Sequence, residues 1–352
     1  MNAPRRAPAA VEAGFPLVER FLEHEIEAHA LGFALDRGLV DRLARGPLPM
    51  IDLADRAGLP PERLAMLVGL LAASGVLEER TEGVALAADF RAVLPARDLI
   101  EAKLAFAAAA AEDLRTLFPA FVGDMPAFMG RSRTFELFRY DRCFDLTPEN
   151  LAATRRWVSY TTCLTRYEAG PCLDRIDLTR HRRLLDLGGN SGEFAARACA
   201  RAAHLSATVV DLPVVCALGR ENLAGRAEGA RVAFHPCDMR RDALPTGHDL
   251  VTFKSVLHDW PPEEARALLI RAGAVLEPGG RLVIFERAPL PRRGRRADFA
   301  SAPNLVFEPF FRPADLYREV LQGLGFSEIT AGLVALETPF HLIEARKPGP
   351  RP

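Results

Sequence analysis

The sequence predicts an α/β protein of two domains: an N-terminal all-α winged-helix dimerisation domain and a C-terminal Rossmann-like, doubly wound domain. Three observations lead to this prediction. Apolar residues recur at helical spacing over residues 15–73. Strands and helices alternate after residue 183, which is typical of a parallel sheet. A turn at Gly188 and Gly189 separates the first of these strands from a helix predicted at 191–203. A chain of 352 residues is long enough for two cores.

The N-terminal part has the pattern of a winged helix. Two short helices at 51–57 and 61–73 precede two strands, at 76–80 and 84–87. A DNA-reading helix should present Arg or Lys to the major groove. The second helix has only Arg63 beside an apolar stripe, which favours packing or dimerisation over DNA binding. We therefore predict a disordered tail at 1–14, a dimerisation domain at 15–95, a helical linker at 96–175 that roofs the active site, and a Rossmann-like domain at 176–347.

The linker is helical in pattern from 99 to 173, and Thr147-Pro148 marks the start of its last long helix. Aromatic residues gather in this region. They are either core residues or the roof of an active site, and the sequence leaves both open. The candidates for contact with a substrate here are Phe128, Trp157, Tyr160 and Cys163.

The glycine-rich turn predicts a nucleoside-containing cofactor. Residues 184–187 form a short apolar strand that glycines end, so the backbone can approach a ligand closely at the start of the next helix. Asp211 ends the second strand, where a carboxylate usually binds ribose hydroxyls. Asn190 takes the place of the second glycine of a dinucleotide motif, and no Gly-Lys-Ser/Thr is present. S-adenosylmethionine, which has a ribose and no phosphate, fits this turn.

Further strands at 231–235, 249–253 and 281–285 continue the alternation. In open α/β sheets, ligands bind beyond the carboxyl ends of the strands. Candidate functional side chains gather at that predicted edge: Asp186, Asp211, Asp238, His258 and Glu286.

Composition excludes several other classes of protein. The net charge of -1 gives no general basic field for nucleic acid or an anionic membrane. The longest apolar run, at 104–111, is too short to span a bilayer. The N-terminus lacks the apolar core of a signal peptide, and six cysteines form no Cys-x-x-Cys pair. We expect a cytoplasmic protein with reduced thiols.

These motifs together resemble the class I, S-adenosylmethionine-dependent small-molecule O-methyltransferases, of the caffeate and acetylserotonin type and the bacterial type that tailors natural products. The resemblance covers about residues 25–347. It depends on the glycine turn at 185–192, Val210-Asp-Leu-Pro213, Cys237-Asp-Met239, the segment 254–260 with Leu257-His-Asp-Trp260, and Pro278-Gly-Gly280 before Glu286.

The resemblance implies a homodimer and a cofactor site. Gly188 and Asp211 would bind S-adenosylmethionine, Asp238 and Met239 would flank its adenine, and Lys254 would contact the cofactor region. The residues that we assign to the cofactor are Asp186, Gly188, Gly192, Asp211, Leu212, Asp238, Met239, Lys254 and Trp260.

By the same resemblance, His258 is the general base. A phenol has a higher pKa than histidine, so proton transfer from the phenol to the imidazole is unfavourable. A carboxylate beside the imidazole would stabilise the imidazolium and reduce this difference in pKa. Glu286 and Glu308 are the candidates, because Phe311 stands where plant members carry a carboxylate. Asp259 is either a helix cap or a substrate contact, and Phe311 is a further substrate candidate. We expect no metal, although His258 and Asp259 could supply ligands with His341.

The predicted function is methyl transfer to a hydroxyl, expected to be phenolic, of a small aromatic or polyketide-type natural product. Three alternatives stay open: C-methylation, a non-methylating reaction that uses the same cofactor, and a winged-helix regulator that senses it. The arginine run at 292–296 is a solvated loop, or a landing site for an anionic substrate or carrier protein.

Overall fold

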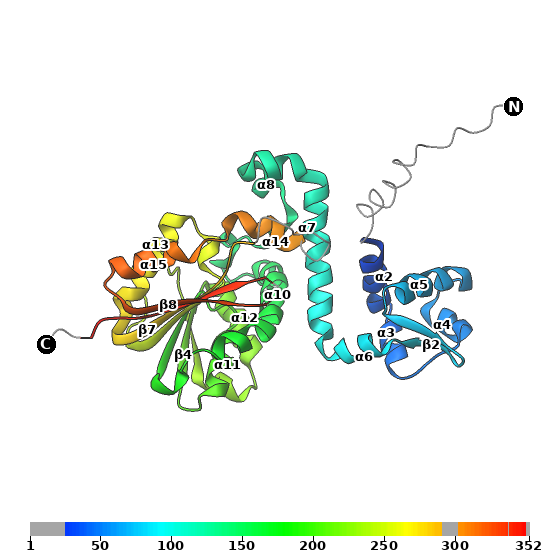
Figure 1. Cartoon of the computed structure of the whole chain (residues 1–352), viewed down its shortest axis with the longest axis horizontal. Coiled ribbons are helices and arrows are strands. Elements are labelled where there is room, and N and C mark those ends of the chain that lie inside the picture. The colour runs from blue at the N-terminus through cyan, green and yellow to red at the C-terminus, as the bar shows by residue number, and fades with distance from the viewer. Residues whose placement is uncertain (1–24, 291–301, 337, 350–352) are drawn as a thin grey trace, which may run out of the picture. The chain divides into compact units, whose positions relative to one another are not determined.

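The computed structural model describes residues 25–290, 302–336 and 338–349. The predicted tail at 1–14 and the arginine run at 292–296 lie outside the described residues. The described chain divides into two compact units, one made of residues 25–111 with Ala302 and the other of residues 112–290, 303–336 and 338–349. Figure 1 labels many of their elements.

The first unit consists of short helices and one hairpin. Pro61 begins a helix because its missing N–H would be unpaired there in any case. The hairpin strands pair antiparallel from Leu77 with Leu86 to Arg80 with Gly83, as the sequence predicts. In order, the elements are α2 (Glu25–Asp36), α3 (Leu39–Ala44), α4 (Met50–Ala57), α5 (Pro61–Ala73), β1 (Leu77–Arg80), β2 (Gly83–Leu86), α6 (Ala88–Val93), η1 (Leu94–Ala96) and the first half of α7 (Arg97–Gly123).

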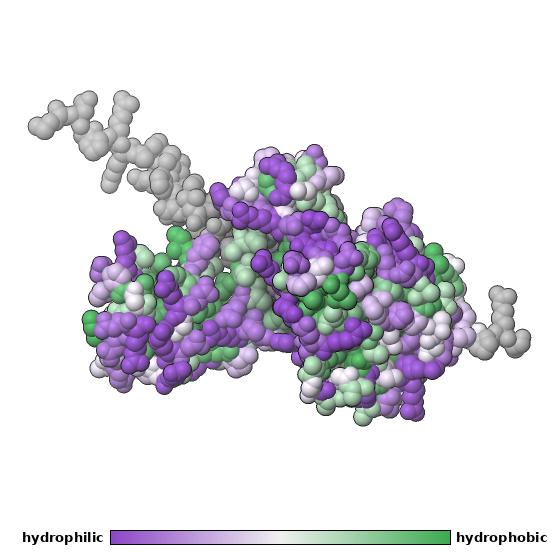
Figure 2. Space-filling view, turned by 180° about the vertical axis from the view of Figure 1, so that it is seen from behind, coloured by the Kyte–Doolittle hydropathy of each residue, from purple (hydrophilic) through white to green (hydrophobic). Residues whose placement is uncertain are grey.

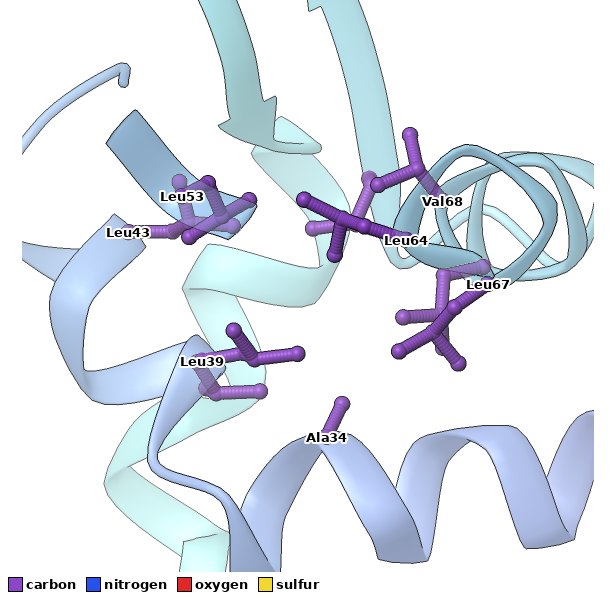
Figure 3. Close-up of a pocket in the computed structure, with 10 residues that line it drawn as sticks. Ala34, Leu39, Leu43, Leu53, Leu64, Leu67 and Val68 are labelled. Carbon is purple, nitrogen blue, oxygen red and sulfur yellow. The ribbon is translucent and has the colours of Figure 1, made fainter. Parts of the chain in front are cut away.

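The apolar stripe of α5 packs into the core of this unit. Leu64 and Leu71 are almost completely buried, so the apolar face of the helix that a DNA reader would present packs inward. A small pocket in this core has only aliphatic side chains around it (Figure 3). Its lining residues are Ala34, Leu39, Val40, Leu43, Leu53, Leu64, Leu67, Val68, Leu71 and Leu77.

The surface of the first unit also carries apolar side chains. Ile26, Ile51 and Met66 are each more than half exposed. Figure 2 shows apolar residues that interrupt the hydrophilic surface of this unit. These side chains are therefore accessible to a partner that packs against this unit.

The second unit begins with helices that precede its sheet: the end of α7, α8 (Met125–Arg131), α9 (Arg133–Leu137), η2 (Asp141–Cys143) and α10 (Pro148–Leu173). Thr147 caps α10 by accepting a hydrogen bond from the amide of Asn150 at 3.2 Å, as the Thr-Pro pair predicts. Asp113 of α7 accepts hydrogen bonds from the Ser132 hydroxyl and the Thr134 amide, which fixes α9 to α7.

A seven-stranded sheet forms the centre of the second unit, in the order β5-β4-β3-β6-β7-β9-β8. The first five of these strands run parallel, and β9 pairs antiparallel with both β7 and β8. The doubly wound prediction is confirmed. The strands are β3 (Arg183–Leu187), β4 (Ser206–Asp211), β5 (Val232–Pro236), β6 (His248–Lys254), β7 (Leu276–Arg287), β8 (Ser327–Val334) and β9 (Phe340–Arg346).

Helices cover both faces of this sheet (Figure 1). On one face, α10 and α11 (Glu193–Arg201) pack against alternate strand residues such as Leu184 and Val209. On the other, α13 (Pro262–Val275) and α15 (Ala314–Gly323) pack against Leu185 and Val251. The remaining elements are α12 (Pro213–Leu223), α14 (Ala302–Phe307) and the 3₁₀ turns η3 (Leu178–Arg180), η4 (Ala227–Arg231), η5 (Leu257–Asp259) and η7 (Glu308–Phe310).

The predicted helix at 191–203 is shorter in the structure. It begins at Glu193, because Gly192 at its N-terminus has a left-handed φ of 73°. Ser191 therefore belongs to the turn, where its hydroxyl accepts a 2.6 Å hydrogen bond from Thr162 of α10. The turn and α10 are thus joined directly. None of the described helices combines the length and apolar character needed to cross a membrane.

Candidate active site

The glycine turn lies at the carboxyl end of β3. Gly188 has a φ of 67°, and a Cβ there would lie 2.8 Å from the side chain of Val256. Asn190 also adopts the left-handed region, with a φ of 55°, which asparagine tolerates better than most residues. The backbone therefore passes close to the end of β6 with no side chain in between.

Asp211 faces this turn from the end of β4. Its carboxylate accepts hydrogen bonds of 2.8 Å from the amides of Asn190 and Leu212. Burial raises the pKa of Asp211 to about 6. The carboxylate at the second strand end is therefore held beside the glycine turn, where the sequence predicts it.

Asp186 is a fully buried carboxylate at this edge. Thr252 donates a 2.6 Å hydrogen bond to one oxygen, and the other has no hydrogen-bond partner in the described structure. Burial raises the pKa of Asp186 to about 7. A Cβ on Gly189 would lie 2.5 Å from the unpaired oxygen, so that oxygen points at the turn.

Arg240 contacts both Asp238 and Trp260. Arg240 donates hydrogen bonds of 3.0 and 2.9 Å to Asp238 and lies 4.2 Å from the centre of the Trp260 ring. Although burial opposes its charge, these hydrogen bonds hold the pKa of Asp238 below its ordinary value. Met239 is buried beside it and accepts a hydrogen bond from Arg271 through its carbonyl.

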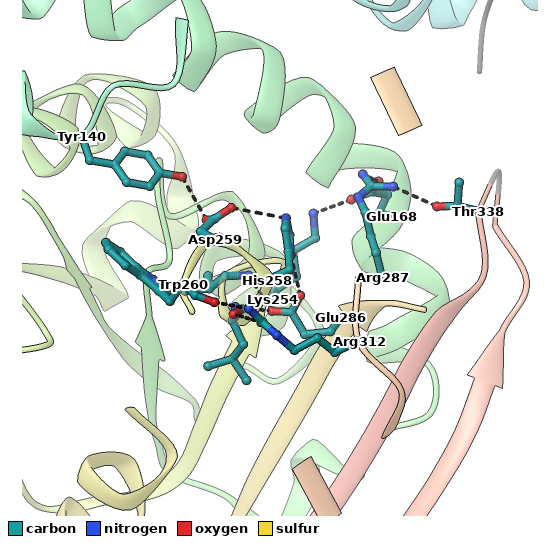
Figure 4. A network of polar contacts seen from close by, with 12 residues as sticks. Tyr140, Glu168, Lys254, His258, Asp259, Trp260, Glu286, Arg287, Arg312 and Thr338 are labelled. Atoms are coloured by element: carbon teal, nitrogen blue, oxygen red, sulfur yellow. Dashed lines mark hydrogen bonds and ion pairs between the residues drawn. The ribbon is translucent and has the colours of Figure 1, made fainter. Parts of the chain in front are cut away.

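Lys254 forms a buried ion network that the sequence did not reveal. Its ammonium pairs with Glu168 of α10, and Arg287 at the end of β7 donates a 2.9 Å hydrogen bond to the same carboxylate. Although burial opposes its charge, the two cations hold the pKa of Glu168 at about 2. Thr338 accepts a further hydrogen bond from Arg287 (Figure 4). The network fixes α10 to two strand ends.

His258 lies between two carboxylates, in η5 after β6. Its Nδ1 is 2.7 Å from Glu286 Oε2, and its Nε2 is 3.4 Å from Asp259 Oδ1 (Figure 4). Burial disfavours the imidazolium, but Asp259 and Glu286 outweigh it and raise the pKa of His258 above its ordinary 6.5. The imidazole is therefore poised to hold a proton.

Glu286 is fixed independently of the histidine. Its Oε1 accepts hydrogen bonds from the amides of Val256 and Leu257, and its side chain is fully buried. Despite the cost of burial, His258 and these amides hold the pKa of Glu286 below its ordinary value. The carboxylate is thus ionised and rigid, and it orients the imidazole through Nδ1.

Of the two glutamates named as candidates, Glu286 contacts the histidine. Glu308 lies in η7, and within the described residues it has no hydrogen bond or ion pair to His258. Phe311 instead places its ring against the imidazole edge to face, with 5.7 Å between ring centres. Next to it, Arg312 donates to the carbonyls of Leu257 and Trp260 and so holds the backbone on both sides of His258.

Aromatic rings from several helices of the second unit form one continuous cluster. Trp157 packs against Phe138 and Tyr140, and Phe138 packs against Phe307 of α14. Tyr140 also contacts the Trp260 ring and donates a 2.9 Å hydrogen bond to Asp259. These rings connect the linker helices with the segment that carries His258.

The predicted substrate residues are distributed over this cluster and its surroundings. Trp157 is buried and belongs to it, while Tyr160 and Cys163 lie further along α10, half-buried and buried. Phe128 is fully buried between Phe121 and Phe135, as a core residue is. Tyr140 and Glu168 were missed, because neither stands in a motif.

Within residues 25–290, 302–336 and 338–349, no group of three or more His, Cys, Asp or Glu side chains is arranged to hold a metal ion. His341 lies on β9 opposite Glu286 in the strand register. No hydrogen-bond partner for its buried Nε2 is found among the described residues.

Residues 142–327, more than half of the chain, match the family described as the O-methyltransferase domain. The chain belongs to this family. A relative of this methyltransferase is the 3-hydroxy-5-methyl-1-naphthoate 3-O-methyltransferase of Streptomyces sahachiroi, 29% identical over 274 residues that cover 74% of this chain and 73% of that protein. Aclacinomycin 10-hydroxylase RdmB of Streptomyces purpurascens is 29% identical over 339 residues, 90% of this chain and 86% of that protein.

Solved structures share the fold of this methyltransferase. The mitomycin 7-O-methyltransferase MmcR is 23% identical, covers 96% of this chain and 99% of its own, and has a TM-score of 0.76. Human N-acetylserotonin methyltransferase, solved in complex with SAM, is 18% identical at a TM-score of 0.67, with 98% and 100% coverage. The predictions of family, fold, O-methyltransferase activity and S-adenosylmethionine as cofactor are confirmed.

The residues at the sheet edge fit this cofactor. Gly188 and Gly189 pack so closely against Val256 and Asp186 that a Cβ would collide there, and the unpaired oxygen of Asp186 points into the turn. The carboxylates of Asp186, Asp211 and Asp238 suit a positively charged sulfonium and a ribose.

Proposed function

We propose that the enzyme transfers a methyl group to a hydroxyl, expected to be phenolic, of a small aromatic or polyketide-type natural product, with His258 as general base. The contact between His258 Nδ1 and the anchored Glu286 carries this proposal. With its proton on Nδ1 and shared with Glu286, the neutral imidazole has its lone pair on Nε2, the nitrogen that would accept the acceptor's proton.

S-adenosylmethionine supplies an electrophilic methyl group, and the residues of this chain would position the acceptor and remove its proton. Transfer needs the hydroxyl in line with the methyl and the sulfur. The aromatic cluster around Trp157 and Phe138 suits a flat ring, and Asp259 could bind a polar group of the acceptor. The name of the Streptomyces sahachiroi relative, a hydroxynaphthoate methyltransferase, supports an aromatic hydroxyl as acceptor.

An assay of methyl transfer from labelled S-adenosylmethionine to a panel of phenols tests this function. Mass spectrometry of the product should place the methyl group on oxygen. Because the relative RdmB is named as a hydroxylase, a non-methylating reaction is a second candidate function. Oxidation of the acceptor without methylation, or a methyl group on carbon, would contradict O-methylation. A gel shift with DNA tests the regulator alternative separately.

We assign the cofactor site to Asp186, Gly188, Gly192, Asp211, Leu212, Asp238, Met239, Lys254 and Trp260. Asp211→Ala is expected to weaken S-adenosylmethionine binding at least about ten-fold, since each hydrogen bond from ribose to a charged acceptor contributes roughly 1.5–3 kcal/mol. Calorimetry checks this, with the exposed Asp55→Ala as control. Equal affinity in wild type and Asp211→Ala would remove Asp211 from the site.

We further propose that the N-terminal domain at 15–95 makes the enzyme a homodimer in the cytoplasm. The exposed apolar residues of the first unit support an apolar interface, expected to bury more than about 2,000 Å². Light scattering at micromolar concentration should report twice 38.6 kDa. A particle of 38.6 kDa would contradict the dimer.

A further inference from the structure

Tyr140 stands outside every sequence motif, yet its hydroxyl reaches the centre of the site. It precedes η2 and donates a 2.9 Å hydrogen bond to Asp259 Oδ2 across 119 residues of chain. The other oxygen of the same carboxylate lies 3.4 Å from His258 Nε2. Among the contacts of the described residues, Tyr140 therefore reaches the histidine through Asp259 alone.

The ring of Tyr140 is fixed on both sides. Its centre lies 5.6 Å from that of Trp157 and 5.9 Å from that of Trp260. Packing therefore contributes to the direction of its hydroxyl. A phenylalanine would keep these ring contacts and remove one donor.

The distance of 3.4 Å between Asp259 Oδ1 and His258 Nε2 exceeds the 2.7–2.9 Å typical of a charge-assisted hydrogen bond. On the other side of the imidazole, the contact with Glu286 is 2.7 Å. Asp259 thus acts on the imidazole mainly as a nearby negative charge. Its effect depends on whether it is ionised.

Several charged groups surround this pair. Glu286 and Arg287 of β7 act on His258 in opposite senses, and Arg312 favours the ionised form of Asp259 while Glu286 opposes it. Burial raises the pKa of Asp259 above its ordinary value, and the Tyr140 hydrogen bond opposes that rise. Tyr140 is therefore one of the groups that keep Asp259 charged.

We propose that Tyr140 is a positioning residue whose hydroxyl holds Asp259, ionised, on the Nε2 side of His258 and so keeps the imidazole protonated to higher pH. This inference rests on the proposed site but is separate from the role of His258 as base. It assigns to the linker a part in the protonation of the histidine. No contact between Tyr140 and the reacting atoms is needed for it.

The test is Tyr140→Phe in the full-length enzyme. Nitrogen NMR of the His258 imidazole, assigned with His258→Gln, should show its titration about 0.5–1 unit lower than in wild type. The physical reason is that Asp259 without its donor protonates more readily, so the imidazolium loses a counter-charge. Affinity for S-adenosylmethionine should stay within about twofold.

Two further variants test whether Tyr140 acts on His258 through Asp259. In an Asp259→Asn background, Tyr140→Phe should cause no additional shift, because the group through which Tyr140 acts has lost its charge. Tyr167→Phe, at a half-exposed position of α10, is the matched control and should leave the titration unchanged.

An unchanged or raised pKa of His258 in Tyr140→Phe would overturn the proposal. It would also be overturned if Tyr140→Phe lowered that pKa equally in the Asp259→Asn background. The pH profile of kcat/KM separates this from the catalytic proposal. In Tyr140→Phe, a lower pKa of His258 with no change in the acid limb of the kcat/KM profile would have two consequences. It would show that Tyr140 positions Asp259 as proposed, and that His258 is not the base.

Discussion

His258→Gln is expected to lower turnover about 10²–10⁴-fold at neutral pH while cofactor affinity and fold are retained. The physical reason is the loss of a base at the carboxyl edge of β6, where the acceptor hydroxyl should lie. The loss should shrink as pH rises, because solvent then ionises a phenol and removes the need for a base. Steady-state kinetics between pH 6 and 10, with calorimetry for the cofactor, measure both quantities.

The pH dependence of kcat/KM in the wild-type enzyme can also be predicted. A base must be unprotonated, and Asp259 and Glu286 raise the pKa of His258 above 6.5. The acid limb of kcat/KM should therefore lie above pH 6.5, with activity lost as the pH falls through it. Near wild-type turnover in His258→Gln would show that alignment alone drives the transfer. A variant equally inactive at every pH would point to positioning.

Glu286→Gln is expected to lower turnover by a similar factor of about 10²–10⁴. A glutamine oxygen can still accept from the amides of Val256 and Leu257, which should preserve the segment. Its amide group would then face Nδ1 as a donor. The imidazole proton would move to Nε2, the nitrogen that must accept one, so the histidine would be held in the wrong tautomer.

Glu308→Gln is the matched control for this change. Glu308 lies in the same region of the unit without a hydrogen bond or ion pair to His258 among the described residues, so turnover should stay within about twofold. Nitrogen NMR of the imidazole distinguishes the tautomers directly. Normal activity in Glu286→Gln together with a large loss in Glu308→Gln would reverse the assignment.

The sequence predicts the sheet edge well because local rules determine it. Glycines in the left-handed region, a Thr-Pro helix start and alternating strands are readable one segment at a time, and parallel pairing then brings Asp186, Asp211 and Glu286 to one edge. The choice between Glu286 and Glu308 was open, because it depends on the rotamer of one carboxylate and on which amides it meets.

The contribution of the linker could not be predicted in the same way. Tyr140 and Glu168 reach Asp259 and Lys254 across 119 and 86 residues of chain, and no spacing rule relates such positions. Helical periodicity places Glu168 on a face of α10 but not beside two cations. Phe128 is fully buried in the described structure, and the sequence pattern alone does not distinguish such an aromatic residue from one that lines a site.

The ring cluster and the proton-handling groups come from separate parts of the second unit. Phe135, Phe138 and Phe307 meet through ring contacts around α9 and α14. Glu286, at the end of β7, is instead held by two backbone amides that follow β6, and its carboxylate holds His258. Ring size can change without disturbing those amides. Descendants of one ancestral enzyme could therefore acquire new acceptors by exchanging aromatic residues while inheriting the same catalytic apparatus, and an engineer can follow the same route.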